Sequence, residues 1–129
     1  MKIKSRLENL RLVEKFIDEI SEEFSLSDEI YGNLLIATME AANNAIVHGN
    51  KQNEELDVEI NMTKSNDGIF LVIKDQGAGF DYLNIPDPTA PGNIEKINGR
   101  GIFLMEKLSD DIEFAHNGSM VKLTFNNKF

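Results

Sequence analysis

The sequence contains no cysteine and has only two histidines among its 129 residues. Without cysteine it can form neither disulfides nor thiolate metal sites, and His48 and His116 are too far apart in sequence to favour a structural zinc site. No apolar run approaches the roughly 20 residues that a membrane-spanning helix requires. The basic start, Met1 to Lys4, is followed by an amphipathic stretch instead of the apolar core of a signal peptide. We therefore expect a cytoplasmic protein.

Positive charge is scarce as well. Lysine and arginine total 13 against 22 aspartates and glutamates, which gives a formal net charge of −9. A sequence-independent nucleic-acid binder needs basic side chains against the phosphates, so we expect no nucleic-acid partner. The same charge favours a basic protein partner through long-range attraction. The length fits one domain, residues 1–129, that can bury a sizeable core.

Two amphipathic helices are predicted in the first half of the chain. Apolar residues recur at helical spacing from Arg6 to Phe24, with charged residues between them. A second helix should begin after Ser27, because its hydroxyl can cap the first free amides. Gly49 should end this helix, since glycine is the commonest residue just past a helix terminus.

The second half predicts four strands and a third helix. A turn signal, Ser65 to Gly68, separates the first two strands, and Gly101 to Leu108 reads as a short helix. A proline-rich loop is expected between Asp75 and Arg100. The predicted strands are 56–62, 69–73, 112–115 and 120–125. This order of elements predicts an α+β fold, a two-layer sandwich of helices on a mostly antiparallel sheet.

Glu40 and Asn44 are the first polar residues that interrupt the apolar pattern. They are four residues apart and therefore share one face of the second helix. A carboxylate there can orient or deprotonate an attacking hydroxyl, and an amide oxygen can bind magnesium. An ordinary solvated helix face would look the same.

Two glycine-containing patches follow. Asp75 can accept a hydrogen bond from the amine of a base, and Gly77 and Gly79 would let the backbone approach a ligand, although a tight turn explains the same residues. The segment Gly99 to Gly101 stands at the predicted start of the third helix, where backbone amides favour phosphate. A flexible hinge is the alternative there.

In this order the three patches resemble the nucleotide-binding boxes of the superfamily that contains gyrase, chaperone-ninety, histidine-kinase and mismatch-repair ATPases. Within it, the segments Asn44 to Gly49 and Asp87 to Pro91 are similar to those of bacterial anti-sigma factor serine kinases. Glu40 stands where histidine kinases carry an asparagine. The likeness runs from about residue 8 to the end and implies a Bergerat-type ATP-binding fold.

The resemblance implies a role for each of these residues. Glu40 would be the general base, Asn44 a magnesium ligand, and Asp75 the acceptor for the adenine amine. The remaining residues would line or close the nucleotide site: Gly77 and Gly79 at the adenine wall, Ser119 beside Asp75 through water, and Gly99, Arg100 and Gly101 over the phosphates. His48 is expected to be a satisfied structural histidine, and His116 to be exposed.

The resemblance also implies an activity and partners. The protein would be an ATP- and magnesium-dependent serine/threonine kinase that acts as an anti-sigma factor, commonly as a homodimer. It would sequester an RNA polymerase sigma factor and phosphorylate an anti-anti-sigma protein. Three alternatives stay open: a non-catalytic module that holds a protein and responds to ATP, a sensor-kinase fragment whose target lies on another chain, and a structural domain with an inactive pocket.

Overall fold

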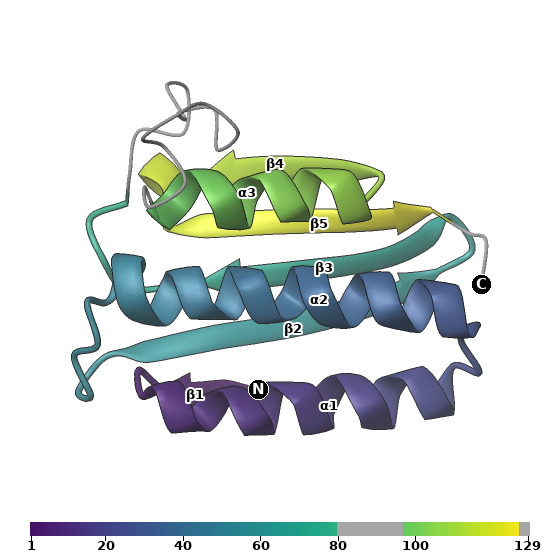
Figure 1. The fold of residues 1–129 in the computed structure, drawn as a ribbon, viewed down its shortest axis with the longest axis horizontal. Coiled ribbons are helices and arrows are strands. Elements are labelled where there is room, and N and C mark those ends of the chain that lie inside the picture. Colours follow the sequence, from purple (N-terminus) through teal and green to yellow (C-terminus); the bar gives the residue numbers. More distant parts are fainter. Residues whose placement is uncertain (80–96, 127–129) are drawn as a thin grey trace.

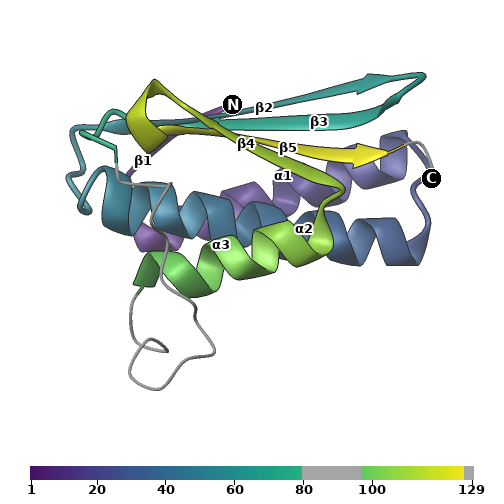
Figure 2. The same cartoon turned by 90° about the horizontal axis from the view of Figure 1, so that it is seen from above.

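The computed structural model describes residues 1–79 and 97–126, with the side chains of residues 97–100 excepted. Within these residues, five strands form one antiparallel sheet in the order β1-β2-β3-β5-β4. The strands are β1 (Lys2–Lys4), β2 (Asp57–Ser65), β3 (Gly68–Lys74), β4 (Asp111–Ala115) and β5 (Met120–Asn126). The helices α1 (Leu10–Glu23), α2 (Asp28–Asn44) and α3 (Ile97–Leu108) lie together on one face of the sheet (Figures 1 and 2). The predicted two-layer α+β architecture is confirmed.

Helix α2 is the centre of the helix layer, with α1 on one side and α3 on the other (Figure 1). It begins as predicted, because the Ser27 hydroxyl accepts a hydrogen bond of 3.3 Å from the Ile30 amide. Its buried residues include the alanines at 37, 41 and 42. Small buried side chains allow α2 to pack closely against its neighbours, chiefly α3 and α1.

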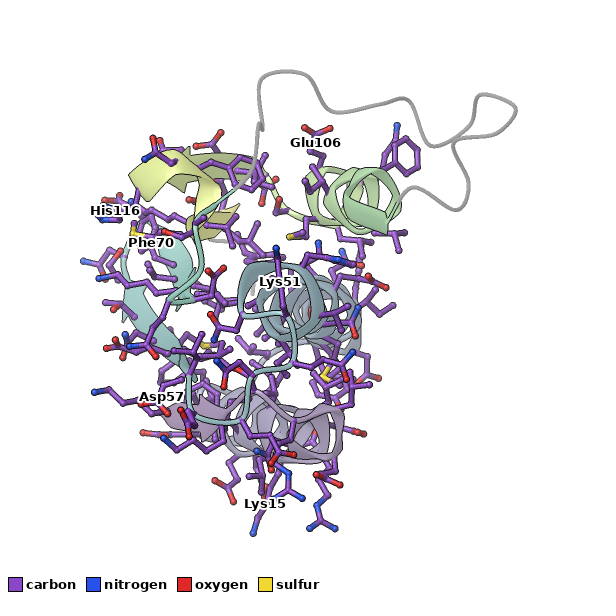
Figure 3. All side chains as sticks on the ribbon, turned by 90° about the vertical axis from the view of Figure 1, so that its left-hand side faces the viewer. Lys15, Lys51, Asp57, Phe70, Glu106 and His116 are labelled. Carbon is purple, nitrogen blue, oxygen red and sulfur yellow. The ribbon has the colours of Figure 1, made fainter. Side chains whose placement is uncertain are left out.

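The core lies between the two layers and follows the alternation read from the sequence. Val58 and Ile60 on β2 are fully buried, while Glu59 between them lies on the outer face. On β3 the odd-numbered residues 69, 71 and 73 are buried and Phe70 lies on the outer face, with the Lys122 ammonium 4.9 Å from its ring centre (Figure 3). Within the described part of the chain, no helix has the length and apolar character needed to cross a membrane.

The structure differs from the sequence prediction at one strand and at the start of one helix. Strand β1 was not predicted, because a three-residue strand with Ile3 as its one buried residue is too short to show alternation. Helix α3 begins at Ile97, four residues before the predicted start at Gly101. Residues 80–96, which include the predicted Asp87–Pro91 segment and most of the predicted loop, lie outside the described residues.

The end of α2 is a π-helical turn, η2 (Ala45–Gly49), instead of a further α-helical turn. The Asn50 amide donates to the Ala45 carbonyl, five residues earlier, at 2.8 Å. Such wide turns contain one residue more than an α-helical turn and often occur at functional sites. The predicted helix end at Gly49 is confirmed, but the turn that carries His48 and Gly49 is wider than expected.

Candidate functional site

A pocket lies where the end of α2, the end of β3 and the start of β5 meet, with α3 beside it. Its volume is about 470 Å³, which includes space open to solvent. Figure 3 views the molecule from this end, with Lys51, just beyond η2, toward the viewer. The lining is mostly apolar, with a few polar groups: Ala41, Asn44, Ala45, His48, Gly49, Ile73, Asp75, Gly79, Ile102, Met105, Phe114, Gly118, Ser119 and Val121. Ligand pockets commonly have this composition.

Four of the residues singled out in the sequence line this pocket together: Asn44, Asp75, Gly79 and Ser119. They come from α2, from the turn after β3, and from the residue before β5, so the fold joins segments 75 residues apart. Among the described residues, the lining does not include Glu40, which is half-buried one turn before Asn44 on α2. Gly77 lies against Gly49, and Gly101 lies against Asn44, so both contact residues of the lining.

The Asp75 side chain is held in a partly buried position at one side of the pocket. Its backbone amide donates to the Ser119 carbonyl at 2.9 Å, and its carboxylate accepts a hydrogen bond of 2.8 Å from the Gly77 amide. Burial raises the pKa of the Asp75 carboxyl above its ordinary value, and the Gly77 hydrogen bond opposes this effect. A ligand group that donates to this carboxylate would replace water that burial has removed.

Glycines near Asp75 allow the chain segments to pack more closely than any other residue would. A Cβ on Gly49 would lie 2.3 Å from the Asp75 carboxyl carbon, and one on Gly77 would lie 1.9 Å from the Gly49 carbonyl oxygen. Gly79 has φ +86° and its Cβ would lie 1.9 Å from the Asn117 carbonyl oxygen. Gly77 and Gly79 were expected to admit a ligand, and in the structure they also admit neighbouring backbone.

Asn44 is in close contact with α3. A Cβ on Gly101 would lie 2.7 Å from the Asn44 amide nitrogen, so this glycine lets α3 approach α2 at the pocket. Gly99, Arg100 and Gly101 are the third to fifth residues of α3, whereas the predicted helix began only at Gly101. The amides in the first turn of any α-helix lack a partner inside the helix, and Gly99 lies in this turn of α3. The side chain of Arg100 lies outside the described residues.

His48 also lines the pocket, which the sequence reasoning did not predict. Its Nε2 is buried and has no hydrogen-bond partner among the described residues, and burial lowers the pKa of the imidazole. The expectation that its hydrogen bonds are satisfied within the fold is therefore wrong for this atom. His116 is exposed as expected, and its carbonyl accepts a hydrogen bond of 2.8 Å from the Ser119 hydroxyl.

The donor set of the pocket fits magnesium that arrives with a phosphate ligand. Among the described residues, no three histidines, aspartates or glutamates gather in a group that could hold a metal ion. Asn44 offers an amide oxygen, and magnesium prefers oxygen ligands and is usually bound through few protein groups, several waters and substrate phosphates. The residues present thus suit a nucleotide–magnesium complex better than a free cation.

Comparison with known proteins identifies relatives along nearly the whole chain. The family model described as the histidine kinase-like ATPase domain matches residues 3–125. Three of the relatives carry the name serine-protein kinase RsbW. The protein of Oceanobacillus iheyensis is 28% identical over 131 residues, covering 96% of this chain and 83% of the relative. That of Bacillus cereus strain Q1 is 25% identical (95% and 80% covered), and that of Bacillus subtilis strain 168 is 24% identical (96% and 82% covered).

Proposed function

The chain belongs to the histidine kinase-like ATPase domain family, and on this premise we propose that it is an ATP-dependent serine/threonine protein kinase. The observation that carries the proposal is the pocket that joins Asn44 of α2 to Asp75 after β3. Relatives named serine-protein kinase, which align with at least 95% of the chain, support the same reaction. The γ-phosphoryl group of ATP would pass to a hydroxyl of a protein substrate.

Asp75 would hold the adenine end of the nucleotide. The adenine amine is a hydrogen-bond donor, and the Asp75 carboxylate is an acceptor in a pocket wall that is otherwise mostly apolar. Gly77 fixes one carboxylate oxygen through its amide, and Gly79 forms the adjoining wall. Ser119 would add a contact through a water molecule, since its hydroxyl can accept a hydrogen bond while it donates to His116.

Asn44 would hold the phosphate end. Magnesium bound with the nucleotide supplies charge neutralisation for the transferring phosphoryl group. The amide oxygen of Asn44 is the protein ligand that we assign to it, and Gly101 keeps α3 close enough for residues 99–101, with the Arg100 charge, to cover the phosphates. Glu40, one turn before Asn44, would accept the proton of the substrate hydroxyl as the general base.

The partners that we propose are proteins. The chain would act as an anti-sigma factor, commonly as a homodimer in the cytoplasm, that sequesters a sigma factor and phosphorylates an anti-anti-sigma protein. The formal charge of −9 suits a basic partner surface and disfavours nucleic acid. These assignments rest on the sequence resemblance.

A second candidate function is supported by the position of Glu40. Because the pocket lining among the described residues excludes it, a module that binds ATP and a protein without phosphoryl transfer would have the same pocket. The two functions differ in whether Glu40 is needed.

The test is a calorimetric titration with ATP, with and without magnesium, followed by transfer from γ-labelled ATP to the cognate antagonist protein. Magnesium-dependent binding with labelled serine or threonine is the expected result. Binding without any transfer would favour the non-catalytic module. Absence of binding under both conditions would overturn the proposal for the pocket.

A further inference from the structure

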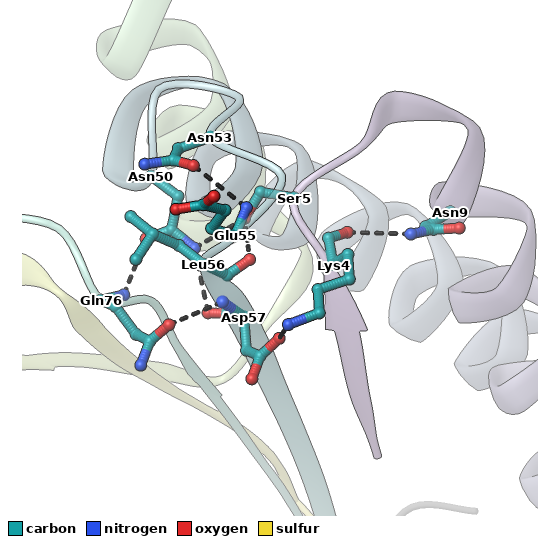
Figure 4. A network of polar contacts seen from close by, with 9 residues as sticks. All are labelled: Lys4, Ser5, Asn9, Asn50, Asn53, Glu55, Leu56, Asp57 and Gln76. Carbon is teal, nitrogen blue, oxygen red and sulfur yellow. Dashed lines mark hydrogen bonds and ion pairs between the residues drawn. The ribbon is translucent and has the colours of Figure 1, made fainter.

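Asn50 is a polar residue buried immediately after the π-helical turn, with 2% of its surface exposed. Burying a carboxamide is costly unless its hydrogen bonds are satisfied. Figure 4 shows that Asn50 is the centre of a network that also contains Ser5, Asp57 and Gln76. The network joins the residue after β1, the start of β2, the residue after η2 and the turn after β3.

Both sides of the Asn50 carboxamide are engaged. Its Nδ2 donates to the Ser5 hydroxyl at 2.7 Å and to the Asp57 carbonyl at 2.9 Å. Its Oδ1 accepts a hydrogen bond of 2.7 Å from the Gln76 amide. The Gln76 side chain closes the circuit, because its Oε1 accepts from the Asp57 amide at 2.7 Å. Asn50 thus fixes the backbone of Gln76 relative to β2.

Two routes lead from Asn50 to the Asp75 carboxylate. The first runs through the Gln76 amide, which belongs to the same peptide bond as the Asp75 carbonyl. The second runs through Gly49, the residue before Asn50, against which the Asp75 carboxyl packs so closely that a Cβ would lie 2.3 Å away. Asn50 therefore holds the turn after β3 through Gln76. Its neighbour Gly49 is the backbone against which the Asp75 carboxyl packs.

We propose that Asn50 is a positioning residue for nucleotide recognition, which acts through Gln76 and Gly49 to set the direction of the Asp75 carboxylate. This inference rests on the proposed adenine-binding role of Asp75. Among the described residues Asn50 is not part of the pocket lining, so it acts without contact to the ligand. Its removal should impair recognition of the base amine and leave the contribution of the phosphate end in place.

The experiment compares two nucleotides that differ in the group Asp75 would recognise. ATP carries the exocyclic amine, and purine riboside triphosphate lacks it. A hydrogen bond from the amine to a carboxylate corresponds to a preference for ATP of about 10- to 150-fold in the wild-type protein. In Asn50→Ala the preference should fall to within about 3-fold, while the affinity for purine riboside triphosphate with magnesium changes little.

Two matched variants separate positioning from general stability. Ser5→Ala removes a partner of Asn50 Nδ2 but leaves the Gln76 amide bonded, so it should lower the melting temperature and keep the preference for ATP. Asn50→Asp retains the oxygen that accepts from Gln76 and should restore much of the preference, while its second oxygen, which faces the Asp57 carbonyl, should lower the melting temperature. If Asn50→Ala does not fold, Asn50→Ser takes its place, because serine also lacks the carboxamide oxygen that accepts from the Gln76 amide.

The outcomes are distinguishable. A wild-type protein that binds both nucleotides equally would refute the adenine role of Asp75, and with it the premise of this inference. A wild-type preference that persists in folded Asn50→Ala or Asn50→Ser would refute the positioning role alone. An equal loss of preference in Ser5→Ala would show that lowered stability is the cause, and would also refute it.

Discussion

Gly49→Ala and Gly32→Ala make the same chemical change on the same continuous run of helix, and the structure gives them opposite consequences. A Cβ on Gly49 would lie 2.3 Å from both the carboxyl carbon and one carboxylate oxygen of Asp75. A Cβ on Gly32, near the start of α2, has nothing within 4 Å. Gly49 is not among the described glycines with positive φ, so alanine fits its backbone and the contact with Asp75 decides the outcome.

The size of the effect follows from the distances. Cβ atoms essentially never approach another heavy atom closer than 3.0 Å, so the Asp75 carboxylate must retreat by at least 3.0 − 2.3 = 0.7 Å. A displacement of this size along a hydrogen bond of ordinary length, about 2.9 Å, lengthens it to about 3.6 Å, at which it is no longer a hydrogen bond. A hydrogen bond to a charged group contributes about 1.5–3 kcal/mol, which corresponds to about 10- to 150-fold in nucleotide affinity.

Stability should respond differently, because the group that must move is the end of a side chain. We expect Gly49→Ala to unfold at a temperature close to that of the wild type. Gly32→Ala should raise the free energy of unfolding by up to about 1 kcal/mol, since alanine is favoured over glycine inside a helix. Its ATP affinity should be unchanged.

Thermal unfolding and calorimetric ATP titration on the three proteins test both expectations. ATP affinity in Gly49→Ala within about 2-fold of the wild type would contradict the role of Asp75, given that an ordinary hydrogen bond cannot tolerate this displacement. A large fall in melting temperature in Gly49→Ala would show instead that the backbone moves and the carboxylate stays.

Asn44→Ala should abolish magnesium-dependent ATP binding with little change in melting temperature, and unaltered affinity in calorimetry would count against Asn44 as the metal ligand. Glu40→Ala should still bind ATP but transfer phosphate at least about tenfold more slowly in a labelled-phosphate assay, because base catalysis typically contributes 10²–10⁴; a wild-type rate would remove the base role. ATP affinity should weaken as pH falls through the raised pKa of Asp75, where the acceptor carboxylate becomes protonated, and Asp75→Asn should not show this dependence. Because the pKa of Asp75 is raised in the folded protein, its contribution to stability is greatest below the unfolded pKa of 3.8 and is lost as pH rises through the folded pKa. Denaturant unfolding of Asp75→Asn should therefore show a smaller decline in the free energy of unfolding over that pH window.

Much of the fold was predictable because its elements are long and strongly patterned. The Ser27 cap and the turn between β2 and β3 were both read from local chemistry, and both are confirmed. The start of α3 was placed too late, because glycine ordinarily disfavours a helix interior. Gly101 is tolerated inside α3 through a tertiary contact with Asn44, and such a contact cannot be seen in the local sequence.

The candidate site was predictable only in part, because residue type indicates some of its residues and tertiary contacts determine the others. Asn44, Asp75, Gly79 and Ser119 meet in one pocket, and residue type and order along the chain had singled them out. Asn50 carried no such signal, because an asparagine after a helix reads as an ordinary terminus. Its importance depends on partners that are 45 residues before it and 26 residues after it, which only the folded sheet brings together.

The π-helical turn has a consequence for how insertions and deletions act on this protein. Removing one codon from the segment 45–49 would shorten no loop; it would allow α2 to continue with ordinary α-helical bonds. Because the π-helical turn holds one residue more than an α-helical turn, the residues after it would keep about the same direction around the helix axis, whereas the same deletion earlier in α2 would rotate them by about 100°. A one-residue deletion should therefore be tolerated better within this turn, after which Asn50 can keep its partners, than earlier in α2, where it would turn Asn44 out of the pocket wall.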